Sequence, residues 1–107
     1  MIKCYRDANG FPRVEADTEE RNLAAFLEQD VQRSEGIYDE FRAAIDAVTE
    51  KETEWSLSGN AHKVTMANDR VVIENLWDDD LDPTVLSISE FASALHEWRR
   101  FLGSQGG

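Results

Sequence analysis

The chain has 107 residues, 41% of them hydrophobic and 31% charged, and 22 acidic against 11 basic residues give it a formal net charge of −11. A chain of this length supports one hydrophobic core, and its composition is typical of a folded domain rather than a disordered segment. The negative charge repels phosphates and anionic lipids, so direct nucleic-acid or membrane binding is disfavoured.

The N-terminal segment MIKCYRDANGF lacks the apolar region of a signal peptide, and no run approaches the length of a membrane helix. We therefore expect a cytoplasmic protein, with one domain over residues 1–102 and a flexible tail at residues 103–107. Cys4 is the only cysteine, so it cannot form an internal disulfide. It is expected to be a small apolar residue of the opening strand.

The first elements predicted are two strands, residues 2–7 and roughly 11–16, joined as a hairpin. Apolar and polar residues alternate in the first strand, and Asn9-Gly10 supplies a pair that tolerates positive φ. Pro12 places the start of the second strand at an edge or ahead of regular pairing, because proline cannot donate to the ladder.

Two helices are predicted next, and together they should form an αα-hairpin. Asp17, with Glu20 three residues later, predicts a capping box for the first helix, and Ser34 is a candidate cap for the second. The apolar positions at helical spacing are Leu23, Phe26, Leu27 and Val31 in the first helix, and Ile37, Phe41, Ala44, Ile45 and Val48 in the second.

From Trp55 to Ile73 the hydrophobic period changes to two, with turns at Gly59-Asn60 and Asn68-Asp69. This pattern predicts a three-stranded antiparallel meander. Because neighbouring strands tend to pair, the meander and the N-terminal hairpin are expected to form a single sheet of about five strands, covered by helices. The predicted fold class is α+β.

The run DDDLDP at residues 78–83 is predicted to be an exposed loop, because its carboxylates repel one another. A short apolar bridge, Val85-Leu86, leads to a second capping box formed by Ser87 and Glu90. The helix that follows places Phe91, Leu95, Trp98 and Leu102 at packing spacing.

The strongest functional signal is a cluster of carboxylates beside a tryptophan. No lysine or arginine interrupts the window from Glu74 to Asp82, and a tryptophan there can anchor an interface. Such a surface would attract a basic partner and could occupy groups that otherwise hold substrate phosphates. The candidate partner-binding residues are Glu74, Trp77, Asp78, Asp79, Asp80 and Asp82, with Asp39, Glu40 and Asp46 of the second helix as further candidates.

Other interpretations of these residues stay open at this point. The aspartates could bind Mg²⁺ or Ca²⁺, although the EF-hand spacing is missing, or they could form a solvated loop while Trp77 lies in the core. His62 and His96, the only histidines, have no metal-ligand partner at helical spacing. We expect no cofactor, no metal and no enzymatic activity, since acid–base catalysis would require a desolvating pocket.

Three stretches, YRDANGFPRVEA, WSLSGNAHKVTMANDRVVIE and SEFASALHEWRRFL, together resemble the small YacL-like family of bacterial proteins. The resemblance spans nearly the whole chain and implies a hairpin, two helices, a strand pair, an acidic segment and a terminal helix. The family has no settled biochemical activity. A housekeeping protein that binds some other cellular component is therefore one hypothesis.

The chain is also similar in size, acidity and layout to immunity proteins of bacterial polymorphic toxin systems, including contact-dependent growth inhibition. In those systems an immunity protein binds one toxin domain, often a basic nuclease, and blocks its active site. The resemblance implies a one-to-one complex with the C-terminal domain of a cognate toxin, such as a ribonuclease or tRNase. Gene order separates the two hypotheses, because an immunity gene should directly follow a toxin gene.

Overall fold

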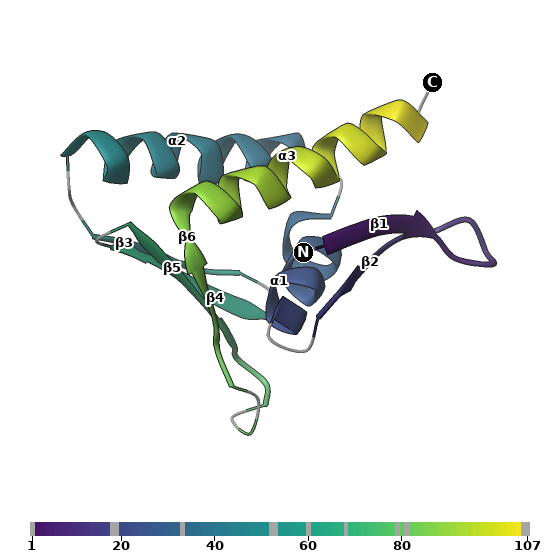
Figure 1. The fold of residues 1–107 in the computed structure, drawn as a ribbon, viewed down its shortest axis with the longest axis horizontal. Coiled ribbons are helices and arrows are strands. Elements are labelled where there is room, and N and C mark those ends of the chain that lie inside the picture. The colour runs from purple at the N-terminus through teal and green to yellow at the C-terminus, as the bar shows by residue number, and fades with distance from the viewer. Residues whose placement is uncertain are drawn as a thin grey trace.

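The computed structural model describes residues 2–17, 20–32, 34–51, 54–59, 61–67, 69–78, 80 and 82–105. The elements in chain order are β1 (Ile2–Arg6), β2 (Pro12–Ala16), α1 (Arg21–Phe26), the π-helix η2 (Leu27–Val31), α2 (Glu35–Lys51), β3 (Trp55–Ser58), β4 (His62–Ala67), β5 (Arg70–Asn75), β6 (Thr84–Ser87) and α3 (Ile88–Gln105). The chain thus has the predicted α+β class (Figure 1).

The strands form two antiparallel sheets, a hairpin of β1 and β2 and a four-stranded sheet in the order β3-β4-β5-β6. The prediction of one five-stranded sheet is therefore wrong. The reason is that α1 packs against both β2 and β5, and so occupies the space between the hairpin and the larger sheet (Figure 1). The fourth strand, β6, was predicted only as an apolar bridge.

The larger sheet buries two cross-strand rows of side chains against the helices. Trp55, Met66, Val71 and Leu86 form one row, and Leu57, Val64, Ile73 and Thr84 form the other. The predicted meander alternation is confirmed, because its inward residues occupy these rows. Such neighbours across strands are the packing unit of a sheet.

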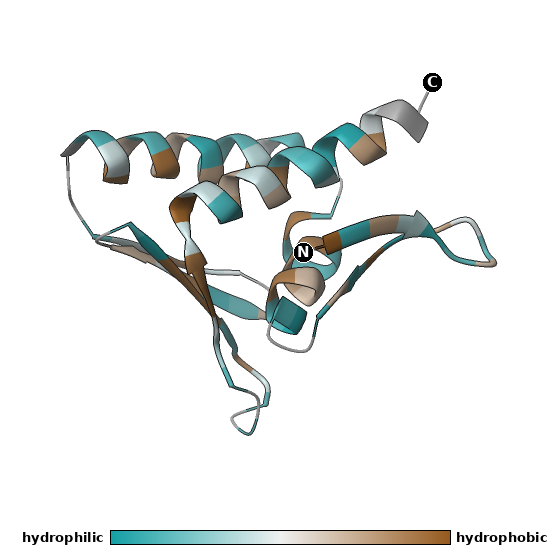
Figure 2. Cartoon of the chain, viewed as in Figure 1, coloured by the Kyte–Doolittle hydropathy of each residue, from teal (hydrophilic) through white to brown (hydrophobic). Residues whose placement is uncertain are grey.

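The helices α2 and α3 lie side by side over one face of the larger sheet (Figure 1), with their apolar residues turned toward it (Figure 2). Three phenylalanines join the helical elements: the ring centroid of Phe26 lies 5.2 Å from that of Phe41 and 5.9 Å from that of Phe91. The helix that runs along α2 is thus α3, and the prediction of an αα-hairpin between the first two helices is wrong. The predicted apolar stripes do face the core.

Two of the three predicted caps are confirmed. The hydroxyl of Ser34 accepts the N–H of Ile37 at 3.2 Å, and Ser87 and Glu90 cap each other reciprocally, with N···O distances of 2.9 and 3.0 Å. The Asp17 cap is not found at α1, which begins at Arg21 with Glu20 as its N-cap residue, and residues 18–19 lie outside the described part.

The last helix is longer than predicted. It extends to Gln105, so the predicted flexible tail is helical from residue 103 to residue 105, while residues 106–107 lie outside the described part. A glycine near a helix end lowers helix stability without forbidding the conformation. Within the part of the chain that the structure describes, no helix combines the length and the apolar character that crossing a bilayer requires.

The capping box makes a prediction about acid stability. Hydrogen bonds from the backbone and then the side chain of Ser87 lower the pKa of Glu90. In the unfolded chain Glu90 has the ordinary glutamate pKa of about 4.3, so above that pH its ionised form stabilises the fold. This contribution is lost as the pH falls through the lower pKa that Glu90 has in the folded protein. Thermal melting should show Glu90→Gln less stable than wild type at neutral pH, with the difference shrinking under acid conditions.

The control is Glu97→Gln, a change of the same chemistry further along α3. It removes a carboxylate that takes no part in the capping box, so the melting temperature of this variant should equal that of the wild-type protein at each pH. A constant difference between Glu90→Gln and wild type across the acid range would contradict the role given to the ionised cap.

Candidate functional site

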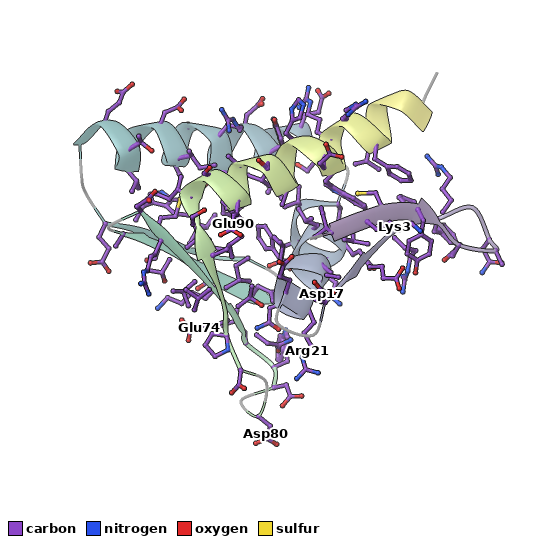
Figure 3. All side chains as sticks on the ribbon, in the orientation of Figure 1. Lys3, Asp17, Arg21, Glu74, Asp80 and Glu90 are labelled. Atoms are coloured by element: carbon purple, nitrogen blue, oxygen red, sulfur yellow. The ribbon has the colours of Figure 1, made fainter. Side chains whose placement is uncertain are left out.

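The acidic run forms the loop of a hairpin between β5 and β6. Trp77 is 80% exposed and Leu76 is 43% exposed, and the carboxylates of Asp78, Asp80 and Asp82 are exposed as well. Figure 3 shows Asp80 at the outermost point of this hairpin. The interpretation that places Trp77 in the core therefore does not hold.

Two side chains turn the loop backbone. Asn75 accepts the N–H groups of Trp77 and Asp78 on its Oδ1 at 2.8 and 2.9 Å, and Asp78 accepts the N–H of Asp80 at 3.0 Å. Asn and Asp commonly fold the chain back in this way, because a short side chain replaces the carbonyl of a turn. The outward direction of Trp77 is thus set by the residue that ends β5.

A buried amide anchors the base of the hairpin. Asn22, on α1, is only 1% exposed, and its Nδ2 donates to the carbonyl of Ile73 at 3.1 Å and to that of Asp82 at 2.9 Å. The N–H of Leu76 donates in turn to the carbonyl of Ala61 at 2.8 Å. These contacts tie both sides of the loop to the body of the protein.

The structure separates Glu74 from the tip. Glu74 lies on β5 directly opposite Lys63 of β4 in the strand register. Arg21, at the start of α1, lies near the base of the hairpin (Figure 3), next to the anchoring Asn22. Glu74 and the base of the hairpin therefore have basic neighbours in space, although the sequence window from Glu74 to Asp82 contains none.

The predicted site residues do not form one surface. Asp39, Glu40 and Asp46 are exposed on α2, which lies at the opposite end of the molecule from the hairpin tip (Figures 1 and 3). The loop carries Trp77, Asp78 and Asp80 together with Asp82, whose carbonyl is anchored by Asn22, and we call these four residues the hairpin tip. Asp79 was also predicted to belong to the site, but it lies outside the described residues.

His62 and Cys4 are poorly placed for chemistry. His62 is fully buried on β4, with its Nδ1 3.6 Å from Oδ1 of Asp30, so it cannot meet a substrate from solvent. Burial, with a smaller effect from the charge of Glu97, raises the pKa of Cys4, which makes its thiol a weak nucleophile at neutral pH. Among the described residues, no group of three His, Cys, Asp or Glu is placed to hold a metal ion.

Comparison of the chain with protein-family models, with curated proteins and with solved structures gives no match.

The anchor at Asn22 can be tested by mutation. Replacing Asn22 by alanine leaves the carbonyls of Ile73 and Asp82 without this donor, and a buried polar group left without its partner costs about 1–3 kcal/mol. We expect a loss of stability of this size in chemical denaturation, together with faster hydrogen exchange in residues 74–84.

The matched comparison is Asn75→Ala, which removes the half-buried side chain whose solvent-exposed hydrogen bonds turn the loop. It should speed exchange at Trp77 and Asp78 while costing less stability, because water can replace an exposed hydrogen bond. An equal decrease in the free energy of unfolding for the two variants would contradict the anchoring role of Asn22.

Proposed function

We propose that this protein is an immunity protein that binds a basic toxin domain, such as a ribonuclease or tRNase, in a one-to-one complex through the hairpin tip. The observation that carries the proposal is the exposure of Trp77, at 80%, beside three exposed aspartates. An exposed tryptophan on a loop can serve as an anchor in an interface, where large aromatic residues dominate the binding energy.

The size of the anchor can be put in numbers. A covered tryptophan buries roughly 150–250 Å², which at about 25 cal/mol per Å² corresponds to about 4–6 kcal/mol. Part of this gain offsets the loss of rotational and translational freedom on association. Because the loop is held at its base by Asn22 and turned by Asn75, less entropy remains to be lost when it docks.

The charge of the hairpin tip supports a nucleic-acid-cleaving partner. Such an enzyme holds phosphates with lysine and arginine side chains, and these groups form strong, directional hydrogen bonds with carboxylates. The aspartates would compete for the positions that phosphates take. Their long-range attraction would also raise the association rate, by tenfold or more in a strongly steered encounter.

Charge reversal tests the proposed surface. The variant Asp78→Lys, Asp80→Lys, Asp82→Lys should associate at least about tenfold more slowly at low salt, with a flatter salt dependence, because steering is lost. The partner is the toxin domain encoded directly upstream, and rates are measured by stopped flow at low and at physiological ionic strength. The same variant should fail to rescue cells from growth arrest by that toxin.

The control carries the same change in net charge at the other end of the molecule: Asp39→Lys, Glu40→Lys, Asp46→Lys. Its association rate should fall far less, because these side chains lie on α2, away from the hairpin tip. Equal effects of the two triple variants would reject the hairpin tip as the contact, and the absence of any complex with the upstream product would reject the immunity function itself.

Trp77→Ala tests the anchor separately from the charge. It should increase the dissociation rate and cost at least about 2 kcal/mol of binding free energy, or about thirtyfold in Kd. The melting temperature should stay close to that of wild type, because the side chain is already 80% exposed in the free protein. An unchanged Kd in isothermal titration would contradict the anchor role.

A further inference from the structure

A second surface feature lies where α1, β1, β6 and α3 meet. It is a groove of about 550 Å³, within the usual range for ligand sites. Its floor is apolar, formed by Leu23 of α1, Leu86 of β6, Ala94 of α3 and the half-buried Ile2 of β1. The groove is distinct from the hairpin tip, since Glu90 on its rim lies far from Asp80 in Figure 3.

The hollow has a simple origin in the sequence of α3. Ser89, Ser93 and Glu97 recur every four residues and so share one face of the helix. The two serines are too short to reach across to β1 and α1, and they leave the apolar floor open. All three side chains are exposed, which makes the α3 wall of the groove accessible along its length.

Three carboxylates stand around the apolar floor: Glu20 at the start of α1, and Glu90 and Glu97 on α3. Glu90 accepts the N–H of Ser87 on Oε1, and a carboxylate has further acceptor sites. Beyond Glu97 the surface becomes mixed, because Lys3 and Arg100 line the adjoining hollow together with it. Glu20 and Glu90 do not line that adjoining hollow, so they supply the carboxylates of the groove away from Lys3 and Arg100.

We propose that this groove binds a basic peptide segment of a partner protein. An apolar side chain of the segment would cover the half-buried Ile2 above the buried Leu23 and Leu86, and a neighbouring lysine or arginine would reach Glu20 and Glu90. The carboxylates favour a cationic side chain, and the apolar floor favours an apolar residue next to it. Because the groove is open along α3, it accommodates an extended chain. This site is independent of the hairpin tip and of the function proposed for it.

The test uses capped tetrapeptides as probes, titrated into the ¹⁵N-labelled protein. The basic and apolar peptide Arg-Leu-Leu-Arg should shift the amide signals of Leu86, Ser89, Ser93 and Ala94. The peptides Arg-Ser-Ser-Arg, which lacks the apolar part, and Glu-Leu-Leu-Glu, which reverses the charge, should each bind at least about tenfold more weakly, because the groove needs both features.

A pair of variants locates the site. Ser93→Leu places a large side chain in the groove and should weaken binding of Arg-Leu-Leu-Arg by about tenfold or more. His96→Leu adds the same side chain elsewhere on the exposed surface of α3 and should leave the affinity within about twofold. Both positions are exposed, and circular dichroism checks that the fold is kept.

The proposal is overturned if Ser93→Leu binds as well as wild type, or if the three peptides bind equally. It is also overturned if the shifts disappear when Asp78 and Asp80 are changed to asparagine, because the peptide would then be held by the hairpin tip. If that variant still binds Arg-Leu-Leu-Arg, the result supports the groove as the peptide site, and this conclusion does not depend on whether the toxin complex is found.

Discussion

The buried carboxylate of Asp30 holds η2 against the start of β4 in the larger sheet. Asp30 lies in η2, only 4% exposed, and accepts the N–H groups of Ala61 and His62 at 3.1 and 3.0 Å, where β4 begins. Gly59 packs so closely that a Cβ there would lie 2.7 Å from Oδ2 of Asp30. Since an unpaired buried carboxylate costs several kcal/mol, the turn before β4 and η2 hold each other in place.

Asn22 makes a similar link from α1, the helix that precedes η2. Its side chain bonds to Ile73 of β5 and to Asp82, in the segment that leads to β6. The two short elements, α1 and η2, therefore send one buried polar side chain each into the sheet, and these contacts fix the base from which the hairpin projects. For the binding proposed at the hairpin tip, such a fixed base would lower the conformational entropy lost on docking.

The local parts of the fold could be predicted from sequence and the long-range parts could not. Alternation in the meander and the spacing of Ser87 and Glu90 are signals carried by adjacent residues. Asn22 instead bonds to residues 51 and 60 positions away, and nothing next to it in the sequence indicates this. The exposure of Trp77 was equally undetermined, because this residue lies between the apolar run of β5 and the aspartates of the loop, and either neighbourhood could set its environment.

The hairpin tip and the acidic face of α2 differ in the exposed apolar area that lies beside their carboxylates. At physiological salt, charges interact over only about 8 Å, so a net charge of −11 brings a basic partner near without binding it firmly. Firm binding needs apolar area beside the carboxylates. Among the described residues, the large apolar side chains that are exposed lie on the two β-hairpins: Tyr5, Phe11, Leu76, Trp77 and Val85. The acidic face of α2 has none of them, whereas the hairpin tip places Trp77 beside its carboxylates and so combines charge with apolar area.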